Sequence, residues 1–212
     1  MCDAAFQAWY HDPRTGLCRP FIYGGCGGNK NRYDSLEACQ SACPGGSPDY
    51  DSCKLPTDCQ ITGQGCCGVC NGPGLTTHDF VAFNKQYAAQ VTACPADIAC
   101  EPCPGTTRDQ ATLKYFVPNC VQGQCVVVDL RQSDVTACQS ANDCALRNGN
   151  ACCPACNGDA AIAVRKDGSF ENLVCGSARP PCAACLPAPD SIAICGASGH
   201  CEVEYGVAGQ AP

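Results

Sequence analysis

Two runs of aromatic and β-branched residues near the start of the chain, residues 6–11 and 17–23, predict the strands of a β-hairpin. Residues 12–16 lie between them, and their Asp, Pro and Gly are typical of a turn. Further along, Ser35 can cap a helix that runs through residues 36–43. The pattern therefore predicts a hairpin followed by a short helix over the first part of the chain.

A second apolar pattern lies within residues 77–94, where bulky side chains recur at helical spacing behind a possible Thr77 cap. These side chains are Phe80, Phe83, Tyr87 and Val91. They predict a helix that packs its aromatic stripe on a knot of disulfides. The matching segment later in the chain is shorter and is interrupted by Asp167-Gly168, so the pattern gives only weak support for a helix there.

Cysteine content decides the class of protein. The chain has 25 cysteines in 212 residues, roughly 12%, which exceeds the level typical of disulfide scaffolds. We therefore expect a row of small units held by cross-links, each worth about 2–5 kcal/mol, instead of one large core. Such a density of disulfides requires an oxidising compartment, so the protein is predicted to be secreted, either extracellular or periplasmic.

The cysteines fall into groups of five, ten and ten, and the last two groups form an internal repeat. Each repeat begins Cys-x5-Cys, continues to a Cys-Cys-x2-Cys-Asn-Gly element and a Cys-x2-Cys pair, and ends in a predicted β-hairpin. The expected organisation is a unit at 1–44, a linker at 45–52, cysteine-rich repeats at 53–130 and 131–205, and a tail at 206–212.

The Cys-Cys-x2-Cys and Cys-x2-Cys motifs also have spacings that zinc sites use. Ten cysteines per repeat is an even number, no histidine adjoins the motifs, and the predicted compartment is oxidising, so disulfides are expected and no metal or cofactor is predicted. The three histidines are scattered and form no pair with a nucleophile. An enzyme is not expected.

The net charge of −7 lies downstream of residue 44, because residues 1–44 carry four basic and four acidic side chains. No basic stripe exists, so nucleic acid is not an expected partner. No apolar run approaches the length of a membrane span. No signal peptide precedes Cys2, and the cysteine count is odd; both would follow if further sequence, with the secretion signal, lay upstream of Met1.

The first cysteine group has the spacing Cys-x15-Cys-x7-Cys-x12-Cys-x3-Cys, and residues 19–29 read RPFIYGGCGGN, followed by Asn31 and Tyr33. Spacing and intervening residues resemble the Kunitz family, the type of bovine pancreatic trypsin inhibitor. The resemblance covers residues 2–43. It implies a small disulfide-rich α+β unit, with a twisted β-hairpin and a C-terminal helix, ahead of two cysteine-rich repeats with β-hairpin ends.

The family pairing implies disulfides Cys2–Cys26 and Cys18–Cys39, and it leaves Cys43 unpaired because this chain lacks the family's first cysteine. The resemblance also implies inhibition of a serine protease by a rigid, substrate-like loop clamped by the first pair. The predicted protease-binding residues are Cys2, Asp3, Ala4, Ala5, Phe6, Ile22, Tyr23, Gly24, Gly25, Cys26 and Gly27.

Asp3 occupies the primary specificity position of the family pattern. Its acidic side chain is the departure from that pattern. Trypsin-like pockets contain a carboxylate, and chymotrypsin-like pockets are apolar, so either would bury the Asp3 charge at a cost of several kcal/mol. Strong trypsin inhibition is therefore not expected. Either the target is a protease with a cationic pocket that prefers acidic residues, or the Kunitz unit is a non-inhibitory interaction module of an extracellular binding or structural protein.

Overall fold

The computed structural model describes residues 6–12, 17–43, 50–64, 67–92, 99–107, 110–153, 161–177, 179–183, 185 and 190–206. The chain divides into two compact units. The first contains Met1–Tyr50 with Ala89–Ala93, and the second contains Asp51–Ala88 with Cys94–Pro212. In the part of the chain that is described, no helix combines the length and the apolar character that spanning a bilayer requires.

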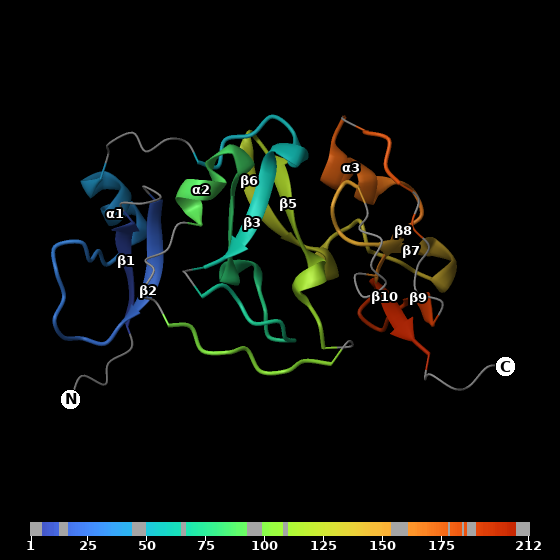
Figure 1. Cartoon of the computed structure of the whole chain (residues 1–212), viewed down its shortest axis with the longest axis horizontal. Coiled ribbons are helices and arrows are strands. Elements are labelled where there is room, and N and C mark those ends of the chain that lie inside the picture. Colours follow the sequence, from blue (N-terminus) through green and yellow to red (C-terminus); the bar gives the residue numbers. More distant parts are fainter. Residues whose placement is uncertain are drawn as a thin grey trace. The chain divides into compact units, whose positions relative to one another are not determined.

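The first unit contains the predicted hairpin and helix (Figure 1). Strand β1 (Phe6–Asp12) pairs antiparallel with β2 (Leu17–Tyr23), and helix α1 (Leu36–Ala42) follows. The Ser35 hydroxyl accepts a hydrogen bond from the Ala38 amide at 3.1 Å, so the predicted cap forms. Strand β1 ends one residue later than expected, because Asp12 continues the ladder by pairing with Leu17.

The first cysteine-rich repeat folds into two antiparallel hairpins and a four-residue helix, α2 (Ala88–Val91). One hairpin joins β3 (Cys59–Gly63) to β4 (Phe80–Asn84), and the other joins β5 (Phe116–Val121) to β6 (Gln124–Asp129). Strand β4 packs against β6 and β3 packs against β5, so the two hairpins lie face to face. The predicted hairpin at the end of this repeat is the one formed by β5 and β6.

The prediction of a helix over 77–94 is wrong for most of that segment. Phe80 and Phe83 belong to β4, which pairs with β3 along its whole length. Both side chains are buried, and the Phe80 ring lies 4.5 Å from the Phe116 ring. Only α2 is α-helical in the described part of the segment. Pairing with a strand distant in the sequence therefore overrides the local helical spacing of the aromatic residues.

The second repeat contains the hairpins β7 (Cys144–Asn148) with β8 (Ala161–Arg165) and β9 (Ser191–Cys195) with β10 (Cys201–Tyr205). Between them lies α3 (Ser169–Cys175), a helix that the sequence supported only weakly. Gly168 adopts φ 76°, a left-handed conformation that glycine tolerates, and forms the N-cap of α3. The Asp167-Gly168 pair therefore turns the chain from β8 into a helix instead of ending one.

Disulfides recur at equivalent positions of the two repeats, as duplication predicts. Two pairs join the first hairpin region of each repeat to its last hairpin. In the first repeat they are Cys53–Cys120 and Cys59–Cys125, and in the second they are Cys138–Cys195 and Cys144–Cys201. The remaining described pairs are Cys67–Cys100, Cys70–Cys103, Cys152–Cys175 and Cys153–Cys182.

The two repeats share one hydrophobic core, which differs from the expected row of separate small units. Val117 and Leu130 come from the first repeat, and Ile162 and Phe170 come from the second; all four are fully buried in the same cluster. The Asn150 side-chain amide reinforces this packing by donating to the carbonyls of Lys114 and Phe116. Apolar burial thus joins what the cysteine pattern presented as two units.

The last two residues of the predicted linker at 45–52 belong to a sheet. The Cys125 amide donates to the Asp51 carbonyl at 2.6 Å, and Ser52 forms a β-bridge with Gln124. Residues 51 and 52 therefore extend the sheet of the β5–β6 hairpin, because their backbone groups pair with it. Residues 44–49 lie outside the described part of the chain.

Candidate functional site at the open end of the Kunitz hairpin

The predicted protease-binding residues are only partly described. Phe6 and residues 22–27 are described, whereas Cys2, Asp3, Ala4 and Ala5 lie outside the described residues. Cys26 is disulfide-bonded, as the predicted clamp requires. The geometry of the site is therefore that of Phe6 and of the second loop, which begins at the end of β2.

Phe6 and Ile22 are large apolar side chains left in solvent at the open end of the hairpin. Phe6 pairs with Tyr23, and Gln7 pairs with Ile22, in the last two positions of the β1–β2 ladder. Phe6 is 60% exposed and Ile22 is 70% exposed, whereas Ala8 is fully buried. Facing residues of the ladder share a face and successive residues alternate, so Phe6 and Ile22 are exposed on opposite faces of the hairpin.

The second loop returns on itself between Tyr23 and Gly28. The Gly28 amide donates to the Tyr23 hydroxyl at 3.2 Å, and the Arg32 guanidinium lies 4.8 Å from the centre of the Tyr23 ring. Gly25 and Gly27 have φ values of 90° and 69°. Only glycine adopts such values at no steric cost, so this loop depends on its glycines for its path.

Asn31 connects the second loop to β1. Its Oδ1 accepts from the His11 amide at 2.8 Å, and its Nδ2 donates to the His11 carbonyl at 2.7 Å. The Asn31 amide in turn donates to the Asn29 carboxamide at 2.9 Å. The family motif identified Asn31 as a residue of the pattern, but its sequence position alone gave no indication of this contact.

The backbone next to Asn31 is held as well. Trp9 and Tyr33 exchange two backbone hydrogen bonds of 2.7 Å, which adds a bridge on the outer side of β1. The Cys18–Cys39 disulfide, the pairing that the resemblance implies, joins β2 to α1, and Cys39 is fully buried. The hairpin is thus fixed to both the returning chain and the helix.

Sequence reasoning missed the Asp12–Arg19 pair. Asp12 is 3% exposed, and its Oδ2 lies 3.4 Å from Arg19 Nε. A buried carboxylate requires such a partner, since an uncompensated charge inside a protein is costly. The pair joins the turn end of the two strands, far along the hairpin from the exposed loop. Asp12 was expected in the turn, so no partner was predicted for it. An acidic residue and a basic residue on facing strands were the signal that could have indicated this ion pair.

Cys43 carries a thiol that forms no disulfide with any described residue. Its Sγ lies 3.5 Å from the Tyr33 hydroxyl. That hydrogen bond is the main cause that raises the pKa of Tyr33 above its ordinary value. The sulfur therefore contributes to the packing of the Kunitz unit through Tyr33.

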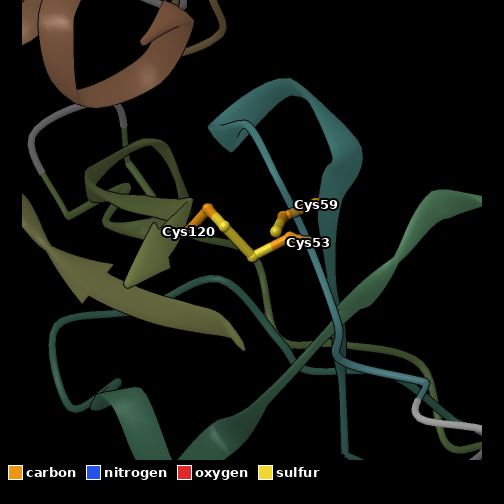
Figure 2. A group of neighbouring side chains, drawn as sticks. All are labelled: Cys53, Cys59 and Cys120. Carbon is orange, nitrogen blue, oxygen red and sulfur yellow. A yellow bond between two sulfur atoms is a disulfide. The ribbon is translucent and has the colours of Figure 1, made fainter. Parts of the chain in front are cut away.

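Sulfur atoms also cluster in the second unit, where a metal site was considered and not expected. The Sγ atoms of Cys53, Cys59 and Cys120 all lie within 4.8 Å of one another, and Figure 2 shows Cys59 beside the Cys53–Cys120 disulfide. Cys59 is itself bonded to Cys125. A metal needs thiolates, so these sulfurs could bind one only after reduction. Cys138, Cys144 and Cys201 form the matching cluster, again within disulfides.

Comparison with known proteins places this site in a family. The profile of the Kunitz/Bovine pancreatic trypsin inhibitor domain matches residues 1–44. Papilin of Drosophila melanogaster is 47% identical over 55 residues, which are 26% of this chain and 2% of papilin. The BPTI/Kunitz domain-containing protein of Haliotis asinina is 47% identical over 57 residues, which are 27% of this chain and 42% of that protein.

A short relative matches over most of its length. PI-stichotoxin-Hcr2f of Radianthus crispa is 52% identical over 42 residues, which are 20% of this chain and 75% of the toxin. The match thus spans three quarters of the toxin, but only a small part of papilin and less than half of the Haliotis protein. Through its residues 1–44, the chain belongs to the Kunitz/bovine pancreatic trypsin inhibitor family.

Proposed function

We propose that residues 1–44 inhibit a serine protease by presenting a rigid, substrate-like loop, with Asp3 at the primary specificity position. The loop comprises residues 2–6, and residues 22–27 form the second contact segment. The observation that carries the proposal is the fixed second loop, in which the Gly28 amide bonds the Tyr23 hydroxyl and Cys26 is disulfide-bonded. Membership of an inhibitor family supports it.

Inhibition would follow from preorganisation. A flexible substrate loses conformational freedom when a protease binds it, whereas a clamped loop has lost that freedom on folding, so more of the contact energy appears as affinity. The hydrogen bond from the Gly28 amide to the Tyr23 hydroxyl, and the disulfide-bonded Cys26, supply this rigidity on the second segment. The proposed role is that of an inhibitor and not of an enzyme.

Asp3 would select the target. A carboxylate that enters a cationic pocket gains a charge-assisted contact, whereas one that enters an acidic or apolar pocket is desolvated without a partner. We therefore propose a protease that cleaves after acidic residues as the target class. The disulfides of the chain support an oxidising, secretory or extracellular location, where such proteases would be met.

The test is inhibition of trypsin and of a glutamyl endopeptidase by the full chain and by its Asp3→Arg variant. We expect the parent to inhibit the glutamyl endopeptidase and the variant to inhibit trypsin, because only the residue in the pocket has changed. Asp3→Asn is the matched control: it keeps the size of the side chain, removes the charge, and should weaken inhibition of the acid-specific enzyme.

The alternative function, a non-inhibitory interaction module, is favoured by one observation, the acidic residue at position 3. It predicts a different pattern in the same assay. If Asp3→Arg inhibits trypsin while the parent inhibits no member of a broad serine-protease panel, the scaffold is competent but the natural unit serves binding. If neither protein inhibits any protease, inhibition through this loop is ruled out.

A further inference from the structure

A cavity among the described residues of the second unit lies where the two repeats meet. Its volume is about 680 Å³, within the range of ligand-binding pockets. Five consecutive residues, the whole of β3 (Cys59–Gly63), line it. Successive side chains of a strand point to opposite faces, so a cavity lined by five residues in a row runs along the edge of the strand and meets its backbone.

The hydrogen-bond register shows which backbone groups of β3 face this cavity. The Gln64 amide donates to the Asp79 carbonyl, one position beyond the last pair of the β3–β4 ladder. Because hydrogen-bonded pairs alternate along antiparallel strands, Thr62 and Gln60 also bond to β4. The N–H and C=O groups of Ile61 and Gly63 therefore point the other way, to the outer edge of β3. No backbone group of any described residue bonds to them there.

The cavity wall carries no charged side chain among the described residues, although the chain has a net charge of −7. Apolar side chains dominate the lining, among them Val69, Phe80, Leu113, Phe116 and Val174. An uncharged, largely apolar occupant therefore complements this wall. The unpaired Ile61 and Gly63 groups add a requirement for alternating hydrogen-bond donors and acceptors, which an extended peptide backbone meets.

In the described part of the second repeat, a long side chain occupies the equivalent position of β7. Arg147 occupies the position of Thr62, counted from the first Cys-x5-Cys of each repeat. Its guanidinium lies 4.7 Å from the centre of the Phe170 ring of α3, and it donates to the carbonyls of Ala151 and Cys152. The place beside β7 is therefore filled by the chain's own side chains, whereas the edge of β3 meets a cavity.

We propose that the outer edge of β3 binds an extended, uncharged peptide segment of a partner protein, which adds a strand at Ile61 and Gly63 and places apolar side chains in the cavity between the repeats. A strand of five residues is about 17 Å long, so the β3 edge offers room for a short segment. The proposal concerns the second unit alone and does not depend on inhibition by the Kunitz unit.

The test is selection of peptides by the full 212-residue chain. A synthetic library of acetylated octapeptide amides, built only from Ala, Ser, Thr, Val, Ile and Phe, is passed over the immobilised protein, and the enriched peptides are titrated. Ile61→Pro removes the outward amide without removing a bond to β4. Leu146→Pro is the matched control, because it removes the outward amide at the corresponding position of β7. A version of each peptide that is N-methylated at every residue lacks all backbone donors.

We expect enriched peptides whose affinity falls at least tenfold for Ile61→Pro and on N-methylation, but is unchanged for Leu146→Pro. In amide NMR spectra, the Ile61 and Gly63 signals should shift on binding. The proposal is overturned if no peptide is enriched, or if enriched peptides bind equally well after N-methylation. Concentration-dependent dimerisation that Ile61→Pro abolishes would also overturn it, since a second copy would then occupy the edge. Should Ile61→Pro fail to fold, the N-methylated peptides decide.

Discussion

The side chain of Asn31 bonds both backbone groups of His11, with its Oδ1 2.8 Å from the His11 nitrogen and its Nδ2 2.7 Å from the His11 oxygen. The Asn31 side chain thus satisfies two backbone groups of β1 that a neighbouring strand would otherwise bond. The same residue stands three positions after Gly28, whose amide bonds Tyr23. The attachment of the returning chain to β1 at His11 therefore depends on a single carboxamide.

Replacing Asn31 by Ala should destabilise the Kunitz unit by about 2–4 kcal/mol, because two hydrogen bonds are lost and a half-buried N–H and C=O are left unpaired. Trp9 is the only tryptophan of the chain and lies in β1, so its fluorescence during urea denaturation reports on this unit. Asn29→Ala removes one exposed hydrogen bond and should cost about 1 kcal/mol or less. Equal effects of the two variants would contradict the role of Asn31.

Removing the Cys18–Cys39 disulfide with the double variant Cys18→Ala, Cys39→Ala should destabilise the same unit by about 3 kcal/mol. The bond closes a loop with a sequence separation of 21, and its loss restores freedom to the unfolded chain. Trp9 fluorescence again measures the change. Cys43→Ala is the control, since this thiol forms no disulfide in the described part of the chain; a comparable loss there would argue against the assignment.

The Kunitz unit could be predicted from the sequence because its signals are local. The turn residues at 12–16 lie between two β-rich runs, Ser35 caps α1, and the cysteine spacing implies the Cys18–Cys39 pair that the structure contains. The hydrogen bonds of Asn31 could not be predicted in this way, because they join residues twenty positions apart. A side chain that bonds a distant backbone leaves no periodic pattern.

The repeats were harder to predict because long-range contacts determine their structure. Phe80 and Phe83 are spaced as on one helix face, yet both are buried in β4, which pairs with β3 and packs against β6. Cysteine content suggested small separate cores, but Leu130 and Phe170, from different repeats, belong to one cluster. Neither the pairing of β4 nor the shared core follows from the spacing of residues within a single repeat.

Phe170→Ala should destabilise the second unit by about 3–5 kcal/mol, because this side chain is fully buried in the core that both repeats share. Calorimetry should show both repeats unfolding in one transition that moves to lower temperature as a whole. Ile192→Ala, at a residue that is 57% exposed, should change stability by less than about 0.5 kcal/mol. Two separate transitions for the repeats would contradict a common core.

Acid should weaken the second unit through Asp58 and Asp143. Backbone amides of Lys54 and Leu55 lower the pKa of Asp58, and those of Gln139 and Ser140 lower the pKa of Asp143. A lowered folded-state pKa adds stability above the unfolded value, about 3.9, and that stability is lost as the pH falls through the folded value.

The double variant Asp58→Asn, Asp143→Asn should therefore lose less stability between about pH 6 and pH 3 than the parent. Asn still accepts hydrogen bonds at a helix cap, so the fold should persist. Urea midpoints measured across this pH range test the expectation. An unchanged pH dependence would show that the two carboxylates do not contribute to acid sensitivity.

Tyr115 should ionise well above the ordinary pKa of a tyrosine, about 10. Burial is the main cause that raises its pKa to about 12; Tyr205 and Glu202 raise it further, and Arg131 opposes them. The neutral form is favoured in the folded protein, so its contribution to stability is present below about pH 10 and is lost as the pH rises through about 12. Tyrosinate absorbance, measured after rapid jumps to a series of pH values, should lose a component with a midpoint near pH 12 in Tyr115→Phe.

The placement of the long-range disulfides determines how the repeats respond to mechanical tension. A force that enters at Cys53 crosses directly to Cys120, and one that enters at Cys138 crosses directly to Cys195, across sequence separations of 67 and 57. The polypeptide between each pair carries no load, so pulling on the chain cannot extend it while the bonds are intact. Most of the second unit therefore cannot be extended by force. Only the chain segments outside these disulfide-closed loops can lengthen under tension.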